Sequence, residues 1–279
     1  MTEKRKKTGR LALALLLILA LIPAGIQTVR WAREHHVSQW VNVRAFALGH
    51  GIPMDAYPES ILALYDRNPE THDFVLYYPL EHDVHRAVTM EDYEDTQGVP
   101  LFLQWDRRWG YMEYGSDVAG LTGCGPVTLA MAGYYLTGGD QQFRPDNMIR
   151  FALEEEYCAP GQGTYWAMMD QGARSLGLDA AEILPGRETI VGSLEAGDLV
   201  ICMMGPGDFT REGHYILLTG IENNRIRIND CNSIANSQRL WGYSEIADQI
   251  RGAWAIGREP LPEPELLPEP EPTREAAEP

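Results

Sequence analysis

The residues with the clearest chemical potential are a cysteine and a histidine about ninety residues apart. Cys124 lies in residues 123–126 (Gly-Cys-Gly-Pro), which open an apolar helical run, and His214 lies in residues 213–215 (Gly-His-Tyr). At a helix start, unpaired N–H groups and the positive end of the helix dipole stabilise a thiolate. An imidazole within hydrogen-bond reach accepts the thiol proton. The pair is therefore typical of a cysteine nucleophile with its general base.

An aspartate further along the chain supplies a third group. Residues 214–221 and 225–230 have the composition of strands, and the two asparagines between them tolerate the left-handed backbone of a tight hairpin. Antiparallel pairing then returns Asp230 to the His214 end of the hairpin. There its carboxylate would orient the imidazole and stabilise the imidazolium.

Each of these residues also has a purely structural interpretation. Cys124 would serve as a small buried apolar residue, His214 as a histidine bonded to the backbone, and Asp230 as the cap of a turn. Against this, His214 is the sole histidine within residues 99–257, and it follows a glycine-rich loop. A strand that starts beside such a loop is a suitable place for a base.

The surrounding elements predict an α+β fold. Helices come first along the chain and strands afterwards, so the helix that begins near the cysteine should pack against an antiparallel sheet. The expected helices are 126–136, 146–156 (capped by Asp146) and 165–176, and the expected strands are 199–203, 214–221, 225–230 and 253–256.

Together these motifs resemble the papain-like cysteine peptidases, specifically the branch similar to the bacteriocin-processing peptidases that cut leaders after double glycine. The resemblance covers residues 99–257. It is carried by residues 99–106 (VPLFLQWD), 108–110 (RWG), 123–126 (GCGP), 213–215 (GHY) and 229–230 (ND).

The resemblance implies a role for each site residue. Cys124 would be the nucleophile, His214 the base and Asp230 the orienting residue. Gln104 would donate a side-chain N–H to the oxyanion alongside the backbone N–H of Cys124. Its structural interpretation is a buried amide that bonds to the loop backbone. No metal or cofactor is needed for this chemistry.

The sequence departs from that family in two ways. Relatives commonly have proline after the aspartate, whereas this chain has Cys231, which adds a thiol and alters the turn. The membrane and nucleotide-binding domains of the leader-processing transporters are not part of this sequence. A stand-alone exported domain is therefore expected.

The first thirty residues predict export. Five basic residues precede an almost unbroken apolar stretch at residues 11–26. As a helix, residues 9–29 would span roughly 30 Å, about one bilayer core. Both an uncleaved anchor and a cleaved signal peptide fit this pattern. Because few basic residues follow, the rest of the chain should face outside, as a single-pass membrane protein or a secreted one.

The charge distribution limits the partners. The formal net charge is −17, but residues 1–30 carry six basic side chains and one acidic, so the remainder carries −22. Such a surface argues against binding nucleic acid or anionic lipid, and it suits solubility or a basic partner.

Composition divides the chain into four parts. Residues 1–30 form the signal or anchor, and residues 31–98 form a stalk or pro-like segment that should pack on the main domain, with a helix at 58–65 and an extended stretch at 71–79. Residues 99–257 form the peptidase-like domain, and residues 258–279 form a disordered tail rich in proline and glutamate. His82 and His85 are spaced as a weak metal pair, and surface histidines are the better interpretation.

The other cysteines and the aromatic residues allow two interpretations each. The remaining cysteines, Cys158, Cys202 and Cys231, lack the spacing of a zinc site. Outside the cell a disulfide among them is open, most simply Cys158 with Cys202, and the sequence does not choose between the pairs. Five aromatic residues either line a substrate groove or fill the core: Trp105, Trp109, Tyr111, Trp166 and Trp241.

The leading hypothesis is an exported or membrane-anchored cysteine peptidase that acts on a peptide or related amide. The partners expected are a peptide or protein substrate, such as a cell-wall peptide, and the membrane through the N-terminal helix, but no nucleic acid. Two alternatives remain open. One is a silent peptide- or wall-binding module on the same fold, and the other is a thiol enzyme that transfers the acyl group to an amine.

Overall fold

The computed structural model describes residues 37–258 apart from residues 85, 160 and 162. The expected signal or anchor and most of the expected tail lie outside the described residues. Within this part of the chain, no helix combines the length and the apolar character that crossing a membrane requires.

An antiparallel sheet organises the main domain. Among the described residues it has six strands in the order β5-β10-β6-β7-β8-β9. All of its neighbouring strands pair antiparallel. The strands are β5 (Leu178–Ile183), β6 (Leu199–Met204), β7 (His214–Glu222), β8 (Arg225–Asn229), β9 (Leu240–Trp241) and β10 (Ile250–Arg258). The β7–β8 turn at Asn223 and Asn224 has φ values of 51° and 58°, which confirms the predicted tight hairpin.

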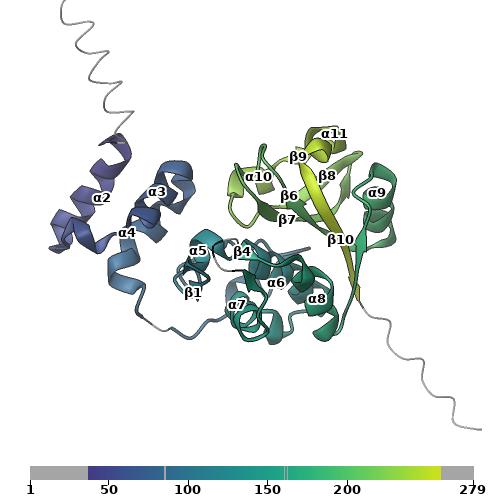
Figure 1. Cartoon of the computed structure of the whole chain (residues 1–279), viewed down its shortest axis with the longest axis horizontal. Coiled ribbons are helices and arrows are strands. Elements are labelled where there is room, and N and C mark those ends of the chain that lie inside the picture. The colour runs from purple at the N-terminus through teal and green to yellow at the C-terminus, as the bar shows by residue number, and fades with distance from the viewer. Residues whose placement is uncertain (1–36, 85, 160, 162, 259–279) are drawn as a thin grey trace, which may run out of the picture.

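Helices cover both faces of this sheet (Figure 1). Along β6, Leu199 and Ile201 contribute to the core on the α6 side, whereas Val200 and Cys202 contribute to a second core with α9. This period of two is what a strand buried on both faces produces. The helices of the main domain are α5 (Ala119–Thr122), α6 (Cys124–Leu136), α7 (Pro145–Glu154), α8 (Gln171–Ser175), α9 (Arg187–Ala196), α10 (Ile234–Gln238) and α11 (Tyr243–Ile246).

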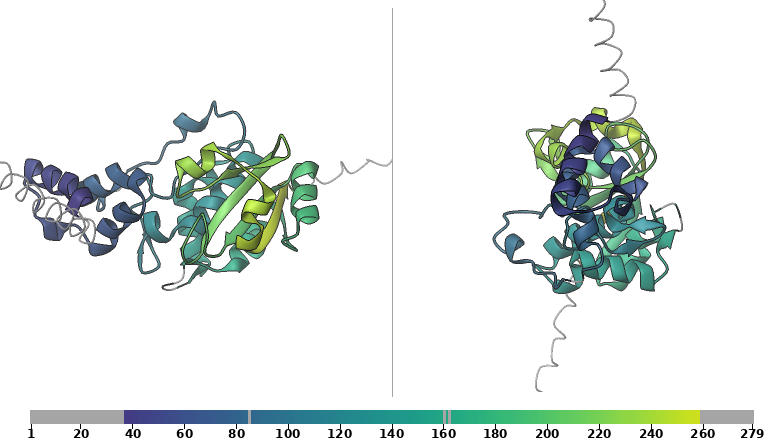
Figure 2. Two further views of the ribbon diagram at one scale, coloured as in Figure 1. Left: turned by 90° about the horizontal axis from the view of Figure 1, so that it is seen from above. Right: turned by 90° about the vertical axis from the view of Figure 1, so that its left-hand side faces the viewer.

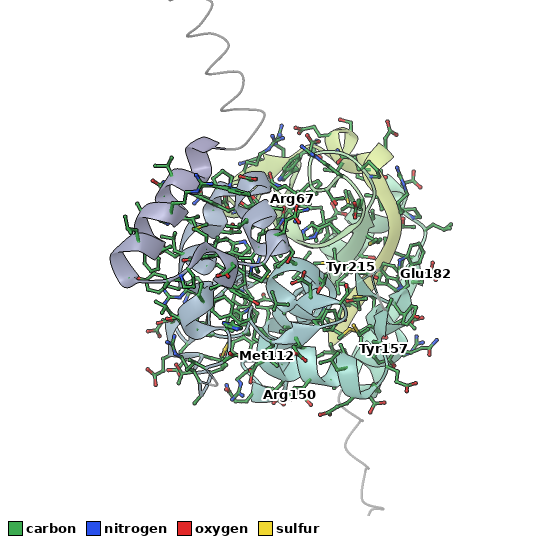
Figure 3. The ribbon with its side chains drawn as sticks, turned by 60° about the vertical axis from the view of Figure 1, so that its left-hand side comes forward. Arg67, Met112, Arg150, Tyr157, Glu182 and Tyr215 are labelled. Carbon is green, nitrogen blue, oxygen red and sulfur yellow. The ribbon has the colours of Figure 1, made fainter. Side chains whose placement is uncertain are left out.

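The α+β prediction is confirmed, with α6 packed on the antiparallel sheet. Helix α6 is buried on every side from Gly125 to Tyr134, as its continuous apolar sequence predicts. It ends where Gly138 and Gly139 take φ values of 72° and 96°, which confirms the predicted stop. In Figure 3, Tyr215 lies inside the molecule between the sheet and the helices.

The segment before the main domain is helical. It contains α2 (Val37–His50), α3 (Glu59–Arg67) and α4 (His72–Glu81). These helices share a hydrophobic core with Tyr111 and Val118 of the main domain. Figure 2 shows α2 to α4 at one end of the molecule and the sheet at the other.

Short elements complete the chain. Two small hairpins are formed by β1 (Glu113–Tyr114) with β2 (Asp117–Val118) and by β3 (Cys158–Ala159) with β4 (Gly163–Thr164). The 3-10 helices are Met54–Ala56, Pro69–Thr71, Glu91–Tyr93, Gln141–Phe143, Trp166–Met169 and Ala247–Gln249.

The expected extended stretch at 71–79 is wrong, because most of it belongs to α4. Its aromatic and β-branched residues suggested a strand. In the fold, Phe74, Val75 and Leu76 are buried on the helix, so tertiary packing overrides local propensity. The proline at position 79 is tolerated close to the end of the helix.

Two helix boundaries also differ from the prediction. Asp146 does not cap α7: Pro145 occupies the first turn, and the Asp146 carboxylate pairs instead with Arg144 and Arg150. The expected helix 165–176 is interrupted at Asp170, whose side chain accepts the N–H of Gln171 and starts α8 anew.

Replacing one glycine by alanine in each of two helices should change the free energy of unfolding in opposite directions. A Cβ on Gly133 of α6 would lie 2.0 Å from Cδ1 of Phe143, whereas a Cβ on Gly192 of α9 meets nothing within 4 Å. We expect Gly133→Ala to lower the free energy of unfolding by about 1–3 kcal/mol. Gly192→Ala should raise it by roughly 0.5–1 kcal/mol. Urea unfolding followed by tryptophan fluorescence measures both, and equal midpoints would contradict this packing.

Candidate active site

Cys124 is the first residue of α6, after Gly123 as the N-cap. The N-cap residue supplies no side-chain hydrogen bond to this helix start. The backbone N–H of Gly125, in its first turn, is among the groups that lower the pKa of the Cys124 thiol. Position 125 needs a glycine for a steric reason: a Cβ there would lie 2.4 Å from Oγ1 of Thr164 on β4. The absence of that Cβ lets β4 lie beside the helix start. The Cys124 side chain remains partly exposed.

His214 and Asp230 are held together by the β7–β8 hairpin. His214 begins β7, and Asp230 directly follows β8. Nε2 of His214 lies 2.7 Å from Oδ1 of Asp230, and the two residues are only 5% and 1% exposed. A hydrogen bond between charged groups is about twice as strong as a neutral one, and burial protects it from water.

The Asp230 carboxylate is fixed on both of its oxygens. Oδ1 also accepts the backbone N–H of Asn232 at 2.9 Å, and Oδ2 accepts Nδ2 of Asn236 at 2.8 Å. The backbone N–H of Asp230 donates to Oγ of Ser237 at 2.9 Å. The carboxylate therefore has one orientation, and it presents one oxygen to the imidazole.

The thiol and the imidazole shift each other's pKa in opposite directions. Burial raises the pKa of Cys124, but the hydrogen bond and charge of His214, together with backbone N–H groups, bring that pKa below its ordinary value. Burial lowers the pKa of His214, but the charge and hydrogen bond of Asp230 bring it well above its ordinary value. Both shifts favour the thiolate–imidazolium pair over the neutral thiol and imidazole.

Gln104 is buried beside the same helix start. One N–H of its Nε2 donates to the carbonyl of Gly120 at 2.9 Å. A primary amide carries two such hydrogens, so a second N–H is available in addition to this bond. The bond to Gly120 is the contact with the loop backbone that a purely structural role of Gln104 predicts. The second N–H is the one that an oxyanion donor would use.

Cys231 adds a second thiol to the cluster. It is fully buried, and its S–H donates to Oε1 of Gln104 at 3.4 Å. Burial raises its pKa, although the nearby His214 imidazole acts against that shift. The backbone carbonyl of Cys231 also accepts the N–H of Gln104 at 2.8 Å. Cys231 therefore holds the Gln104 side-chain amide through its thiol and the Gln104 backbone through its carbonyl.

The structure brings together all four residues that sequence reasoning selected. It adds Cys231, Asn236 and Ser237, which hold Gln104 and Asp230. Sequence reasoning noted Cys231 only as a departure from a family. The two α10 residues carry no motif and follow Asp230 by six and seven positions, so only a folded loop shows their role.

The disulfide state, which the sequence left open, is settled by the fold: all four cysteines, Cys158 and Cys202 included, are free. Cys158 packs against the core on the α6 side, and Cys202 belongs to the core with α9, so the sheet lies between them. Of the five aromatic residues, Trp109, Tyr111 and Trp241 are buried as core residues. Trp166 is 44% exposed and packs edge-on against Trp254.

Three side chains of the cluster could hold a metal ion. His214, Asp230 and Cys231 offer ligand atoms that all lie within 4.8 Å of one another. Nitrogen and sulfur ligands suit a thiophilic ion such as Zn²⁺. Such an ion would compete with the hydrogen bonds that prepare Cys124.

Zinc should therefore inhibit the thiol through Cys231. We expect Zn²⁺ to slow alkylation of Cys124 by iodoacetamide, and Cys231→Ala to weaken this inhibition by at least about tenfold, because a thiolate ligand is lost. Cys158→Ala is the matched control and should leave the inhibition constant unchanged. Equal inhibition of the wild type and Cys231→Ala would exclude Cys231 as a ligand.

Comparison with known proteins gives structural neighbours only. No family model matches the chain, and no curated protein matches it. One solved neighbour is the peptidase domain of Streptococcus ComA, a bifunctional ABC transporter involved in quorum sensing, with 17% identity and a TM-score of 0.41 over 58% of this chain and 99% of that one. Another is a C39-like peptidase from Bacillus anthracis, with 14% identity and a TM-score of 0.35 over 60% of this chain and 96% of that one. The structural neighbours are thus C39 peptidase domains.

Proposed function

We propose that this chain is a papain-like cysteine peptidase that cleaves a peptide or related amide bond through Cys124, His214 and Asp230. The observation that supports this most is the His214 imidazole held by Asp230 beside the thiol at the start of α6. Its Nε2 lies 2.7 Å from Oδ1 of Asp230, and its interaction with Cys124 lowers the pKa of that thiol. A silent binding module has no need of this arrangement, since it lowers the pKa of a thiol that would never react.

The reaction begins with the thiolate of Cys124. It attacks the carbonyl carbon, and the oxyanion accepts the backbone N–H of Cys124 and the second N–H of Gln104. The His214 imidazolium then protonates the leaving amine, and a thioester remains on the enzyme. His214, now neutral, takes a proton from water as that water attacks the thioester. The acid product leaves, and the thiolate–imidazolium pair is restored.

Asp230 acts on the imidazole and not on the substrate. Its carboxylate keeps the ring oriented toward the thiol and stabilises the positive charge between the two half-reactions. The buried position strengthens that interaction, since little water competes with it.

We further propose that the enzyme works outside the cell. The basic residues and the apolar stretch at the start of the sequence support export, with the membrane as a partner if the segment is retained. The strongly acidic remainder supports a peptide or protein substrate, including a cell-wall peptide, and not a nucleic acid.

The pH dependence of alkylation tests the activated pair. Because the pKa of Cys124 is lowered, its thiolate forms below the ordinary thiol pKa of about 8.5, and iodoacetamide should react rapidly near neutral pH. His214→Ala removes the stabilising imidazolium, so the midpoint of the rate profile should rise to about 8.5 or above. Mass spectrometry of the labelled peptide assigns the reaction to Cys124. A wild-type midpoint near 8.5 that His214→Ala leaves unchanged would refute the pair.

Product analysis tests the reaction itself. The purified protein and its Cys124→Ala form are incubated with a peptide library, with and without an added amine, and the products are weighed by mass spectrometry. Hydrolysis predicts new carboxyl termini with the wild type only, and His214→Ala should slow cleavage roughly 10²- to 10⁴-fold. Amine adducts would indicate acyl transfer, and full biological activity of Cys124→Ala would indicate a binding module.

A further inference from the structure

The helical segment before the main domain contacts the loop that carries Asp230. This helical segment is residues 37–81, with α2, α3 and α4. We propose that it is a built-in component of the active site, and that its Glu70 is a positioning residue for Asp230. This inference rests on the proposed function, because it concerns the same carboxylate, and it assigns a role to a part of the chain that carries no catalytic residue.

The first link joins the Glu70 carboxylate to the start of the short helix α10. Oε2 of Glu70 accepts the backbone N–H of Ile234 at 2.6 Å, and Oε1 accepts that of Ala235 at 3.0 Å. These are the first two residues of α10, whose N–H groups have no partner within the helix. Glu70 therefore completes the start of α10 from a position 164 residues earlier in the chain.

The second link runs from α10 to the catalytic carboxylate. Asn236 and Ser237 of α10 hold the side chain and the backbone N–H of Asp230, at 2.8 and 2.9 Å. A shift of α10 would therefore move both contacts together. Because α10 has only five residues, its own hydrogen bonds give it little stability, and the outside carboxylate matters more.

A second contact holds the other side of the same loop. Nδ2 of Asn68 donates to the carbonyl of Asn232 at 2.6 Å, and the same carbonyl accepts Nε1 of Trp105 at 3.2 Å. The backbone N–H of Asn232 bonds to Oδ1 of Asp230. The loop after Asp230 is thus held at two points, Asn232 and the start of α10, and Trp105 directly follows Gln104.

The helical segment is itself firmly placed on the main domain. Phe74 fits against two glycines, since a Cβ would lie 2.8 Å from its ring at Gly110 and 2.4 Å at Gly120. Tyr111 donates its hydroxyl hydrogen to the carbonyl of Phe74 at 2.7 Å, and Arg107 pairs with the buried Glu81. These contacts give Glu70 a rigid base from which to hold α10.

The location of these contacts argues for support and against blockage of the site. In the part of the chain that the structure describes, the hydrogen bonds from the helical segment to the main domain end on Arg107, Tyr111 and residues 232–235, and none ends on Cys124 or His214. Figure 1 shows α10 on the side of the sheet that faces α3. The segment therefore supports the Asp230 loop from outside and leaves the thiol uncovered.

The test compares Glu70→Ala with Glu59→Ala, an exposed glutamate on α3 of the same segment. Both are made in the full chain, and the pH profile of Cys124 alkylation is measured below the unfolding temperature of each. If Glu70 positions Asp230, Glu70→Ala should make the His214 imidazolium less stable. The midpoint of the alkylation pH profile should then rise by about half a pH unit or more, which corresponds to the loss of one helix-capping interaction. Glu59→Ala should match the wild type, and Glu70→Gln should lie between.

Kinetics and a double variant make the test decisive. With a cleaved peptide, Glu70→Ala should lower kcat about tenfold and change KM less than twofold, because Glu70 acts through α10 on Asp230. In the double variant Glu70→Ala/Asn236→Ala, kcat should be little lower than in Asn236→Ala alone, since both residues act through α10.

The two proposals can fail separately. If Glu70→Ala and Glu70→Gln match Glu59→Ala in both the alkylation profile and kcat while the wild type cleaves peptide, the positioning role is wrong and the peptidase stands. If the profile moves with Glu70→Ala but no peptide is cleaved, positioning holds and peptidase activity fails.

Discussion

The hydrogen bond between His214 and Asp230 is the interaction on which the rest of the site depends. The bond is 2.7 Å long, and both residues are almost completely buried. Water therefore does not solvate the Asp230 carboxylate. Removing a charge from water carries a large penalty unless hydrogen bonds satisfy it. The three hydrogen bonds to the Asp230 carboxylate meet that requirement, and the carboxylate in turn raises the pKa of the His214 imidazole. The low pKa of the Cys124 thiol then depends on that imidazolium.

This dependence explains why distant parts of the chain converge on one short loop. A hairpin alone brings Asp230 near His214, but it does not set the angle of the carboxylate. That angle is set by α10, which is too short to be rigid alone, and hence by the helical segment that bonds to its start. The helical segment and the Asp230 loop are thus joined through Glu70.

The sequence predicts the parts of this arrangement that have local causes. The continuous apolar run of α6, the glycines that end it and the asparagine turn all follow from short-range preferences, and they place Cys124, His214 and Asp230. Contacts between distant residues were beyond such reasoning. The helical state of α4 depends on packing against Tyr111, and the role of Asn236 depends on how a loop closes. Sequence also left a Cys158–Cys202 disulfide open, because it does not show that a sheet lies between the two thiols.

The site contains two thiols beside one imidazole, and physical position decides which one reacts. Both interact with His214, so closeness to the base does not separate them. Cys124 is partly exposed at the start of a helix of thirteen residues, whose dipole favours a negative charge. Cys231 is fully buried, its pKa is raised, and its hydrogen is engaged by Gln104. In the proposed reaction the helix start therefore makes Cys124 the nucleophile, and the Cys231 thiol holds the Gln104 amide.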